Sequence, residues 1–229
     1  MTALFKLLQP ELEEVRQRLH KEITFRKRFT PDFNWPALSE LDQKFLPTLV
    51  LISANAKVFL SKKALSLATI FQFIFLASFI HCKAEKNIAL ETLMGDYFYT
   101  RFFDLLCRDD NIEFLEPLSK MICQIHLQAN KQNCELDIKK TGSDNSFSKV
   151  FLAKEAAYLG SKLGHVSLKE SKVWQEVGIL LGKLWDKQPV TTQAMHAIEK
   201  LTSGQAKKVL GEFVLYLSSQ ISDKKVIAL

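Results

Sequence analysis

Glycine and proline are scarce in this chain, with 8 glycines and 6 prolines among 229 residues. A β-sandwich needs frequent turns, and these two residues supply many of them. Long stretches contain neither residue, and none alternates apolar and polar positions as a half-buried strand does. The sequence therefore argues against a sheet sandwich and predicts helices joined by short turns.

The chain also lacks the patterns of several common functional classes. Its 4 cysteines form no CxxC pair, and its 5 histidines form no zinc-finger spacing and no HExxH motif. The net charge is +6, but basic and acidic residues are mixed, and the run Arg26-Lys27-Arg28 is short. We therefore expect free thiols in a cytoplasmic protein without a signal peptide, and no nucleic-acid partner.

The most hydrophobic segment, residues 64–80, includes serine, threonine and glutamine among its apolar residues. A transmembrane helix needs roughly 20 mainly apolar residues, and this run is shorter and less uniform. A central helix surrounded by other helices explains the composition better. We therefore predict no transmembrane segment, while peripheral contact with a membrane stays open.

Apolar residues recur three and four positions apart along most of the chain, as they do on one face of an α-helix. The first such segment covers residues 5–29, and Pro47 is expected to open the second, since proline is tolerated in a first turn. These patterns predict one all-α domain, residues 1–229, built as a bundle of about eight to ten helices. Later helices are expected at 112–138, 147–163, 168–185, 191–201 and 205–221, with a loop at 139–146 and Ser203 as the last N-cap.

Residues 93–103 place a Gly-Asp pair inside a helical pattern of apolar and aromatic residues. A glycine there costs about 1 kcal/mol relative to alanine, so Gly95 indicates close approach of another helix. Asp96 is expected to cap the helix or to form an ion pair, for example with Arg101. The residues that share one face of this helix are Met94, Tyr97, Phe98, Arg101 and Phe102.

Several segments resemble the trans-polyprenyl diphosphate synthase family and occur in the family's order. Gly95-Asp96-Tyr97 is similar to the family's Gly-Asp-Tyr-Leu helix, and residues 46–51 are similar to its Arg-Pro-Leu-Leu-Val-Leu segment. Residues 75–81 resemble the apolar segment that precedes the first aspartate-rich motif, and 156–164 and 197–218 resemble later helices. The resemblance implies the all-α isoprenoid synthase fold.

The family's chemistry depends on two Asp-Asp-x-x-Asp motifs that hold magnesium on an allylic diphosphate. Carboxylates at i and i+4 lie on one helix face, so they can share hard cations. After His81 this chain has Cys82-Lys83-Ala84-Glu85-Lys86 instead, and Pro189-Val190 stands where the second aspartate pair is expected. We therefore expect no catalytic residue, no cofactor-binding residue and no metal ligand here.

Other positions with characteristic family residues have changed as well. The Gly-Lys and Arg that bind isopentenyl diphosphate before the second helix correspond to residues 41–46, the Lys-Thr pair of a later helix to Ser148-Lys149, and the Phe-Gln pair at the second site to Trp185-Asp186. Asp109-Asp110 is the remaining aspartate pair and is expected to be a solvated turn.

A chain of this family without metal motifs resembles the small, non-catalytic component of a heteromeric heptaprenyl diphosphate synthase. That resemblance implies a catalytic partner with intact aspartate-rich motifs and its own magnesium, a polyprenyl diphosphate product and a role in menaquinone side-chain synthesis. The alternatives are a non-enzymatic helical protein that binds a hydrophobic ligand or partner helix, and an enzyme with an unrecognised site. The predicted partner interface or product tunnel contains Phe75, Phe79, Gly95, Asp96, Tyr97, Phe98 and Phe102.

Overall fold

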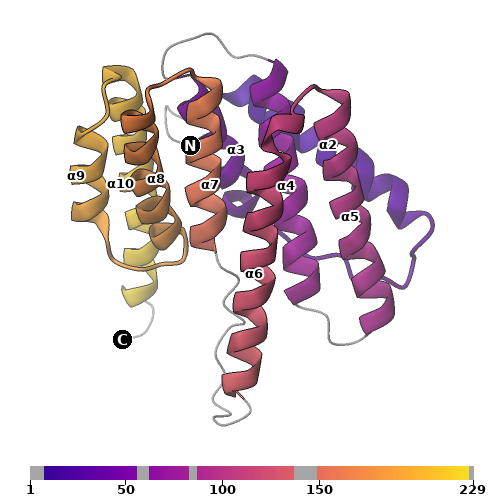
Figure 1. Cartoon of the computed structure of the whole chain (residues 1–229). Helices are drawn as coiled ribbons and strands as arrows, with labels where there is room; N and C mark the ends of the chain where they lie inside the picture. The colour runs from indigo at the N-terminus through magenta and orange to yellow at the C-terminus, as the bar shows by residue number, and fades with distance from the viewer. Residues whose placement is uncertain (1–7, 56–61, 83–86, 137–148, 227–229) are drawn as a thin grey trace.

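The computed structural model describes residues 8–55, 62–82, 87–136 and 149–226. Over these residues it contains nine α-helices, one short 3-10 helix and no strand, which confirms the predicted all-α bundle. The predicted loop at 139–146 lies outside the described residues. In chain order (Figure 1) the elements are α2 (Gln9–Lys27), α3 (Glu40–Ala54), α4 (Lys62–Cys82), α5 (Ile88–Arg108), η1 (Ile112–Phe114), α6 (Leu115–Leu136), α7 (Lys149–Leu163), α8 (Leu168–Trp185), α9 (Thr191–Glu199) and α10 (Gly204–Val226).

Helix α4 is central, because it packs against α2, α3, α5, α6 and α7. On the other side of α7, helices α8, α9 and α10 form a second group (Figure 1). By length and composition α4 is apolar enough to cross a membrane, but 78% of its most apolar window is buried inside the chain. This burial supports the prediction of a central helix over residues 64–80.

The start of α3 differs from the prediction. The helix begins at Glu40, where the Ser39 hydroxyl accepts a hydrogen bond of 3.1 Å from the backbone N–H of Asp42. Pro47 therefore lies inside the helix and does not open it. A proline in a helix interior removes one backbone hydrogen bond, but the residues around Pro47 are all buried, and their packing keeps the helix continuous. Ser203 does cap α10, by accepting the N–H of Ala206 at 3.2 Å.

Helices α7 and α8 pack closely through small residues. A Cβ placed on Gly178 of α8 would lie 2.5 Å from the carbonyl oxygen of Ala153 and 2.9 Å from the Cβ of Ala157. Both atoms belong to α7 and cannot rotate away, because one is backbone and the other is a short side chain. Gly178 therefore permits a helix approach that no larger residue allows.

We expect Gly178→Ala to lower the free energy of unfolding by roughly 1–3 kcal/mol, because the added methyl group must push α7 and α8 apart. Thermal and urea unfolding measure this change. The matched control is Gly204→Ala at the start of α10, where a Cβ meets no atom within 4 Å. The control should stay within about 1 kcal/mol of the parent. Equal midpoints for the two variants would contradict the close packing of α7 and α8.

Candidate functional site

Three residues at positions where this chain departs from the family's pattern lie in contact. The Lys149 ammonium is 3.2 Å from Asp42 Oδ1, and the indole Nε1 of Trp185 donates to the same oxygen at 2.8 Å. The Lys149 ammonium also lies 4.6 Å from the centre of the Trp185 ring, within cation–π range. The ends of α3, α7 and α8 therefore meet at one carboxylate, which we call the Asp42 network.

The Asp42 carboxylate is well supplied with partners. Burial alone would raise the pKa of this carboxyl, but the hydrogen bonds from Ser39 and Trp185 and the charge of Lys149 outweigh burial and lower the pKa below its ordinary value. The Ser39 hydroxyl donates to Oδ2 at 2.6 Å, and Gln72 of α4 donates to the Asp42 backbone carbonyl at 3.1 Å. Asp42 is therefore ionised at neutral pH, and Lys149 neutralises its charge within the chain.

Aromatic side chains fill the space beside the Asp42 network. The Trp185 ring stacks on Phe45, with centroids 4.3 Å apart and planes at 17°, and lies 5.3 Å from the Phe75 ring. Phe45 also contacts Phe213 of α10, with ring centroids 5.4 Å apart. Phe45, Phe75 and Phe213 are fully buried. Side chains thus occupy the interior between α3, α4, α8 and α10 next to Asp42.

A second polar cluster lies close to where the first aspartate-rich motif is expected. His81 Nε2 of α4 is 3.2 Å from Asp96 Oδ1 of α5, and the His81 ring stacks on Tyr99 with centroids 5.5 Å apart. The Tyr99 hydroxyl lies 2.8 Å from Ser78 Oγ and 2.7 Å from Nε2 of His126 on α6. This histidine–tyrosine cluster links α4, α5 and α6.

Gly95 is the close-packing position that the sequence predicts. A Cβ there would lie 2.4 Å from His81 Nε2, so the glycine makes room for an imidazole from α4. The suggested ion pair between Asp96 and Arg101 is wrong. Residues five apart on a helix point about 140° away from each other, and Arg101 instead binds Glu22 of α2 at 2.7 Å.

The residues at the two metal-motif positions do not fit a magnesium site. Magnesium prefers oxygen ligands, whereas Cys82 offers a half-buried thiol whose pKa is raised by burial. Pro189 and Val190 have no side-chain oxygen and lie in the turn between α8 and α9. Lys83 to Lys86 lie outside the described residues. Within the part that the structure describes, no group of three or more histidine, cysteine, aspartate or glutamate side chains is arranged to hold a metal.

Asp109 and Asp110 form a turn after α5, as predicted. Asp110 has a left-handed backbone with φ of 53°, and its carboxylate lies 3.0 Å from the Lys63 ammonium. Asp109 lies 3.9 Å from a guanidinium nitrogen of Arg18. These basic partners neutralise the pair, which makes it a poor cation site.

Four of the predicted interface or tunnel residues are phenylalanines on α4 and α5. Phe75, Phe98 and Phe102 are at most 1% exposed and lie in this chain's own core, which gives no support to their predicted place at a partner interface. Whether Phe75, Phe98 and Phe102, together with the half-buried Phe79, line a product tunnel stays a prediction.

Tyr97 also faces an element of its own chain. Its hydroxyl donates to Glu22 Oε2 at 2.6 Å, and the Arg26 guanidinium lies 3.6 Å from its ring centre. Phe103, which follows the buried Phe102, is 45% exposed. The sequence pattern does not separate Phe103 from its buried neighbours, because the side of a helix that is buried depends on which other helices it contacts.

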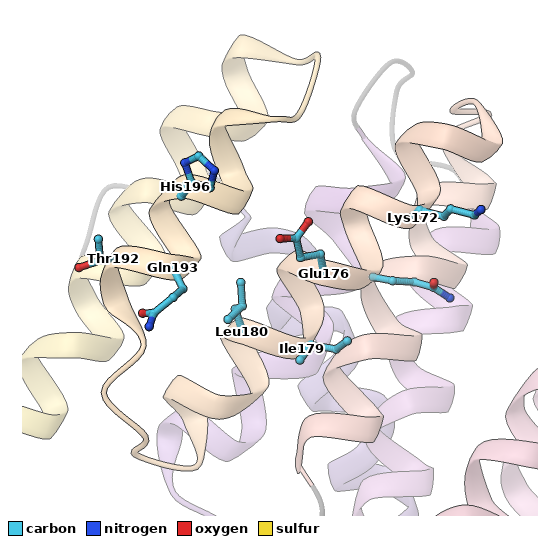
Figure 2. A pocket seen from close by; sticks show the side chains of 8 residues that line it. Lys172, Glu176, Ile179, Leu180, Thr192, Gln193 and His196 are labelled. Atoms are coloured by element: carbon cyan, nitrogen blue, oxygen red, sulfur yellow. The ribbon is translucent and has the colours of Figure 1, made fainter.

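A groove between α8 and α9 was not foreseen from the sequence. Figure 2 shows Lys172, Glu176, Ile179 and Leu180 of α8 opposite Thr192, Gln193 and His196 of α9. The Glu176 carboxylate is bound by Lys200 at 2.9 Å. The groove thus presents aliphatic side chains among polar groups, with one lysine and the carboxylate of Glu176, and this lining suits a diphosphate poorly.

Both histidines of the histidine–tyrosine cluster have lowered pKa values. Burial lowers the pKa of His81, and the nearby Asp96 carboxylate opposes this only in part. Burial also lowers the pKa of His126, and the charge that His81 would carry lowers it further. In the unfolded chain these imidazoles bind protons near pH 6.5, above the folded pKa. Their contribution to stability is therefore complete above about pH 6.5 and declines as the pH falls below it.

The comparisons with known proteins concern the fold. No protein-family model and no curated protein matches this sequence. A solved decaprenyl diphosphate synthase from Rhodobacter capsulatus is similar in structure, with a TM-score of 0.70 and 14% identity over 95% of this chain and 98% of that one. A polyprenyl synthase from Caulobacter crescentus, in complex with calcium and isoprenyl diphosphate, gives a TM-score of 0.58 with 15% identity over 96% and 88%. A polyprenyl synthase from Roseobacter denitrificans gives 0.56 with 16% identity over 98% and 86%.

These similarities define the class of structure. The chain has the all-α isoprenoid synthase fold, and it spans nearly the full length of the decaprenyl synthase. At these identities the likeness establishes the arrangement of helices, and the residues at the site decide the chemistry.

We expect Asp42→Ala to lower the free energy of unfolding by roughly 1–3 kcal/mol, because it leaves the Trp185 N–H and the half-buried Lys149 without their acceptor. A double-mutant cycle with Lys149→Ala should give a coupling energy of at least about 0.5 kcal/mol. The control Glu40→Ala removes an exposed ion pair with Lys44 and should cost less than about 1 kcal/mol. Strict additivity in the cycle would contradict the Asp42 network.

We also expect the melting temperature to fall between pH 7.5 and pH 5, near and below the ordinary histidine pKa of about 6.5, because the buried His81 and His126 resist protonation. In His126→Gln this fall should be smaller, since one of the two imidazoles is gone. His196→Gln on the surface of α9 should leave the slope unchanged. Equal slopes for the His126 and His196 variants would contradict the proposed burial effect.

Proposed function

We propose that this chain is a non-catalytic subunit of a heteromeric polyprenyl diphosphate synthase. The observation that carries this proposal is that Asp42, Lys149 and Trp185, at positions where the chain departs from the family's pattern, bind one another in the Asp42 network. Residues that bind magnesium poorly stand at the motif positions, among them Cys82, Pro189 and Val190. In this proposal a catalytic partner with intact aspartate-rich motifs supplies the magnesium and the chemistry.

The finer parts of the proposal follow from the family resemblance. The chain helps to set the length of a polyprenyl diphosphate product, of the heptaprenyl class, for the side chain of menaquinone. It works in the cytoplasm as part of a heterodimer. What supports a structural role is a fold that covers 98% of a solved decaprenyl diphosphate synthase chain, while polar groups of this chain bind one another.

Helices α5 and α6 offer a surface for the partner. Leu93 and Phe103 are 64% and 45% exposed and lie within one side of α5, and Leu127 on α6 is 62% exposed. Both helices pack against α4. Exposed aromatic and aliphatic side chains on adjacent helices are typical of the core of a stable interface. These three residues replace Phe98 and Phe102 as the proposed interface residues.

The groove between α8 and α9 favours the second candidate function, a non-enzymatic protein that binds a partner helix. Ile179 and Leu180 lie between polar residues of both walls, as in a groove that receives the apolar face of an amphipathic helix (Figure 2). This candidate predicts a complex whose formation leaves prenyl transfer unchanged.

The test is reconstitution with a catalytic polyprenyl synthase subunit from the same genome. We expect the purified chain alone to incorporate no labelled isopentenyl diphosphate into an allylic primer in the presence of magnesium. Mixed with the partner, it should raise activity and change product length. Phe103→Asp should weaken the complex roughly 30-fold, the effect of losing about 2 kcal/mol at a central anchor.

The control is Leu215→Asp, which places the same charge on an exposed position of α10 (62% exposed) and should leave the affinity unchanged. Turnover by the chain alone would overturn the non-catalytic assignment. A complex with normal products but no effect on activity would favour the second candidate. If Phe103→Asp and Leu215→Asp bound the partner with equal affinity, the proposed interface on α5 would be contradicted.

A further inference from the structure

The end of α2 and the residue beyond it expose two aromatic rings. Phe25 is 49% exposed and Phe29 is 66% exposed, and their ring centroids lie 5.3 Å apart. The fold has buried many of its other phenylalanines, including Phe33 in the turn that follows. The C-terminal end of α2 lies at the edge of the molecule (Figure 1). Two adjacent exposed rings at an edge form an apolar tip that the chain itself does not cover.

Cations surround this tip. Lys21, Lys27 and Arg28 are exposed, and within the described residues no carboxylate lies within ion-pair distance of them. The guanidinium of Arg26 lies 5.7 Å from the Phe25 ring centre and 3.6 Å from the Tyr97 ring centre. An open groove beside the tip is lined by His20, Lys21, Thr24, Phe25, Arg26, Arg28, Tyr97 and Arg101, with Glu22 as its carboxylate.

The acidic side chains nearby leave this charge largely uncompensated. Glu22 accepts hydrogen bonds from Tyr97 at 2.6 Å and from Arg101 at 2.7 Å. The charge of its carboxylate is therefore neutralised by Arg101. Asp32 is exposed in the turn beyond Pro31. The segment 21–29 therefore presents an excess of positive charge around exposed rings.

We propose that this segment, Lys21 to Phe29, docks the protein on an anionic membrane surface. Aromatic side chains favour the headgroup level of a bilayer, where an apolar ring and a polar surrounding are both accommodated. Basic side chains within a few ångströms of anionic lipids each add attraction that salt screens. Phe25 and Phe29 enter the interface, and Lys21, Lys27 and Arg28 contact the headgroups.

The observations favour a bilayer over other occupants. A specific protein interface buries more than about 1,000 Å², whereas the exposed tip consists of two rings and a few cations. Single-stranded nucleic acid needs a basic track with rings placed for successive bases, and here the two rings contact each other. A flat anionic surface matches a small tip of mixed aromatic and basic character. This inference does not depend on the catalytic partner.

The 229-residue chain is tested by co-sedimentation with vesicles of phosphatidylcholine and of phosphatidylcholine mixed with phosphatidylglycerol. We expect binding to the mixed vesicles to be at least roughly tenfold tighter than binding to phosphatidylcholine alone, and to decline with added salt. Equal binding to both vesicles, or none to either, would overturn the proposal. So would preferential binding of a labelled single-stranded oligonucleotide in the same buffer.

Charge variants separate local recognition from net charge. Lys27→Glu combined with Arg28→Glu should weaken binding to the mixed vesicles roughly tenfold or more. Lys169→Glu combined with Lys208→Glu makes the same change in net charge at exposed positions elsewhere, and it should have little effect. An equal loss in both double variants would reduce the effect to net charge and overturn the assignment to this segment.

Ring variants test insertion. Phe25→Ser combined with Phe29→Ser removes two exposed rings, and it should weaken vesicle binding several-fold while circular dichroism and the melting temperature remain those of the parent. Leu168→Ser combined with Leu215→Ser, at residues 77% and 62% exposed, is the control and should bind as the parent does. If the phenylalanine variant bound the vesicles as the parent does, the proposal that Phe25 and Phe29 enter the membrane interface would be overturned.

Discussion

The carboxylate of Asp42 joins the ends of three helices, and the closed interior depends on it. A carboxylate that is largely buried needs a partner for its charge. Here Lys149 of α7 and Trp185 of α8 both contact Oδ1 of Asp42. This arrangement also orients the Trp185 ring against Phe45 and Phe75. The polar contact and the aromatic packing therefore support each other, and together they fill the space between α3, α4, α8 and α10.

Much of the fold follows from periodicity. Apolar residues at three- and four-residue spacing locate the helices because each helix must bury one face, and Gly178 fits because α7 approaches α8 closely. The prediction that Pro47 opens the second helix was wrong because it relied on the proline and not on the capping residue Ser39. Ser39 with an acidic residue at Asp42 marks the true start of α3, and tertiary packing tolerates the proline inside. Capping residues are thus better boundary markers here than proline.

The site was less predictable, because it depends on pairs of residues far apart in the chain. That the metal motifs are missing could be read directly from the sequence, and so could the close packing at Gly95. The partner of Asp96 could not, since His81 comes from another helix whose register no local pattern fixes. The division between the buried Phe102 and the exposed Phe103 likewise depends on helix orientation. The Asp42 network joins positions that no spacing rule connects.

We propose, as the central claim, that contacts among this chain's own side chains stand in place of metal-dependent diphosphate binding in a prenyl-synthase fold. Titration calorimetry of the purified chain with a non-ionisable allylic diphosphate analogue, with and without magnesium, tests it most directly. The claim predicts no magnesium-dependent binding by the chain alone, because Cys82, Pro189 and Val190 offer no hard oxygen ligands and the Asp42 network occupies Lys149. Stoichiometric binding of the analogue that requires magnesium would contradict it.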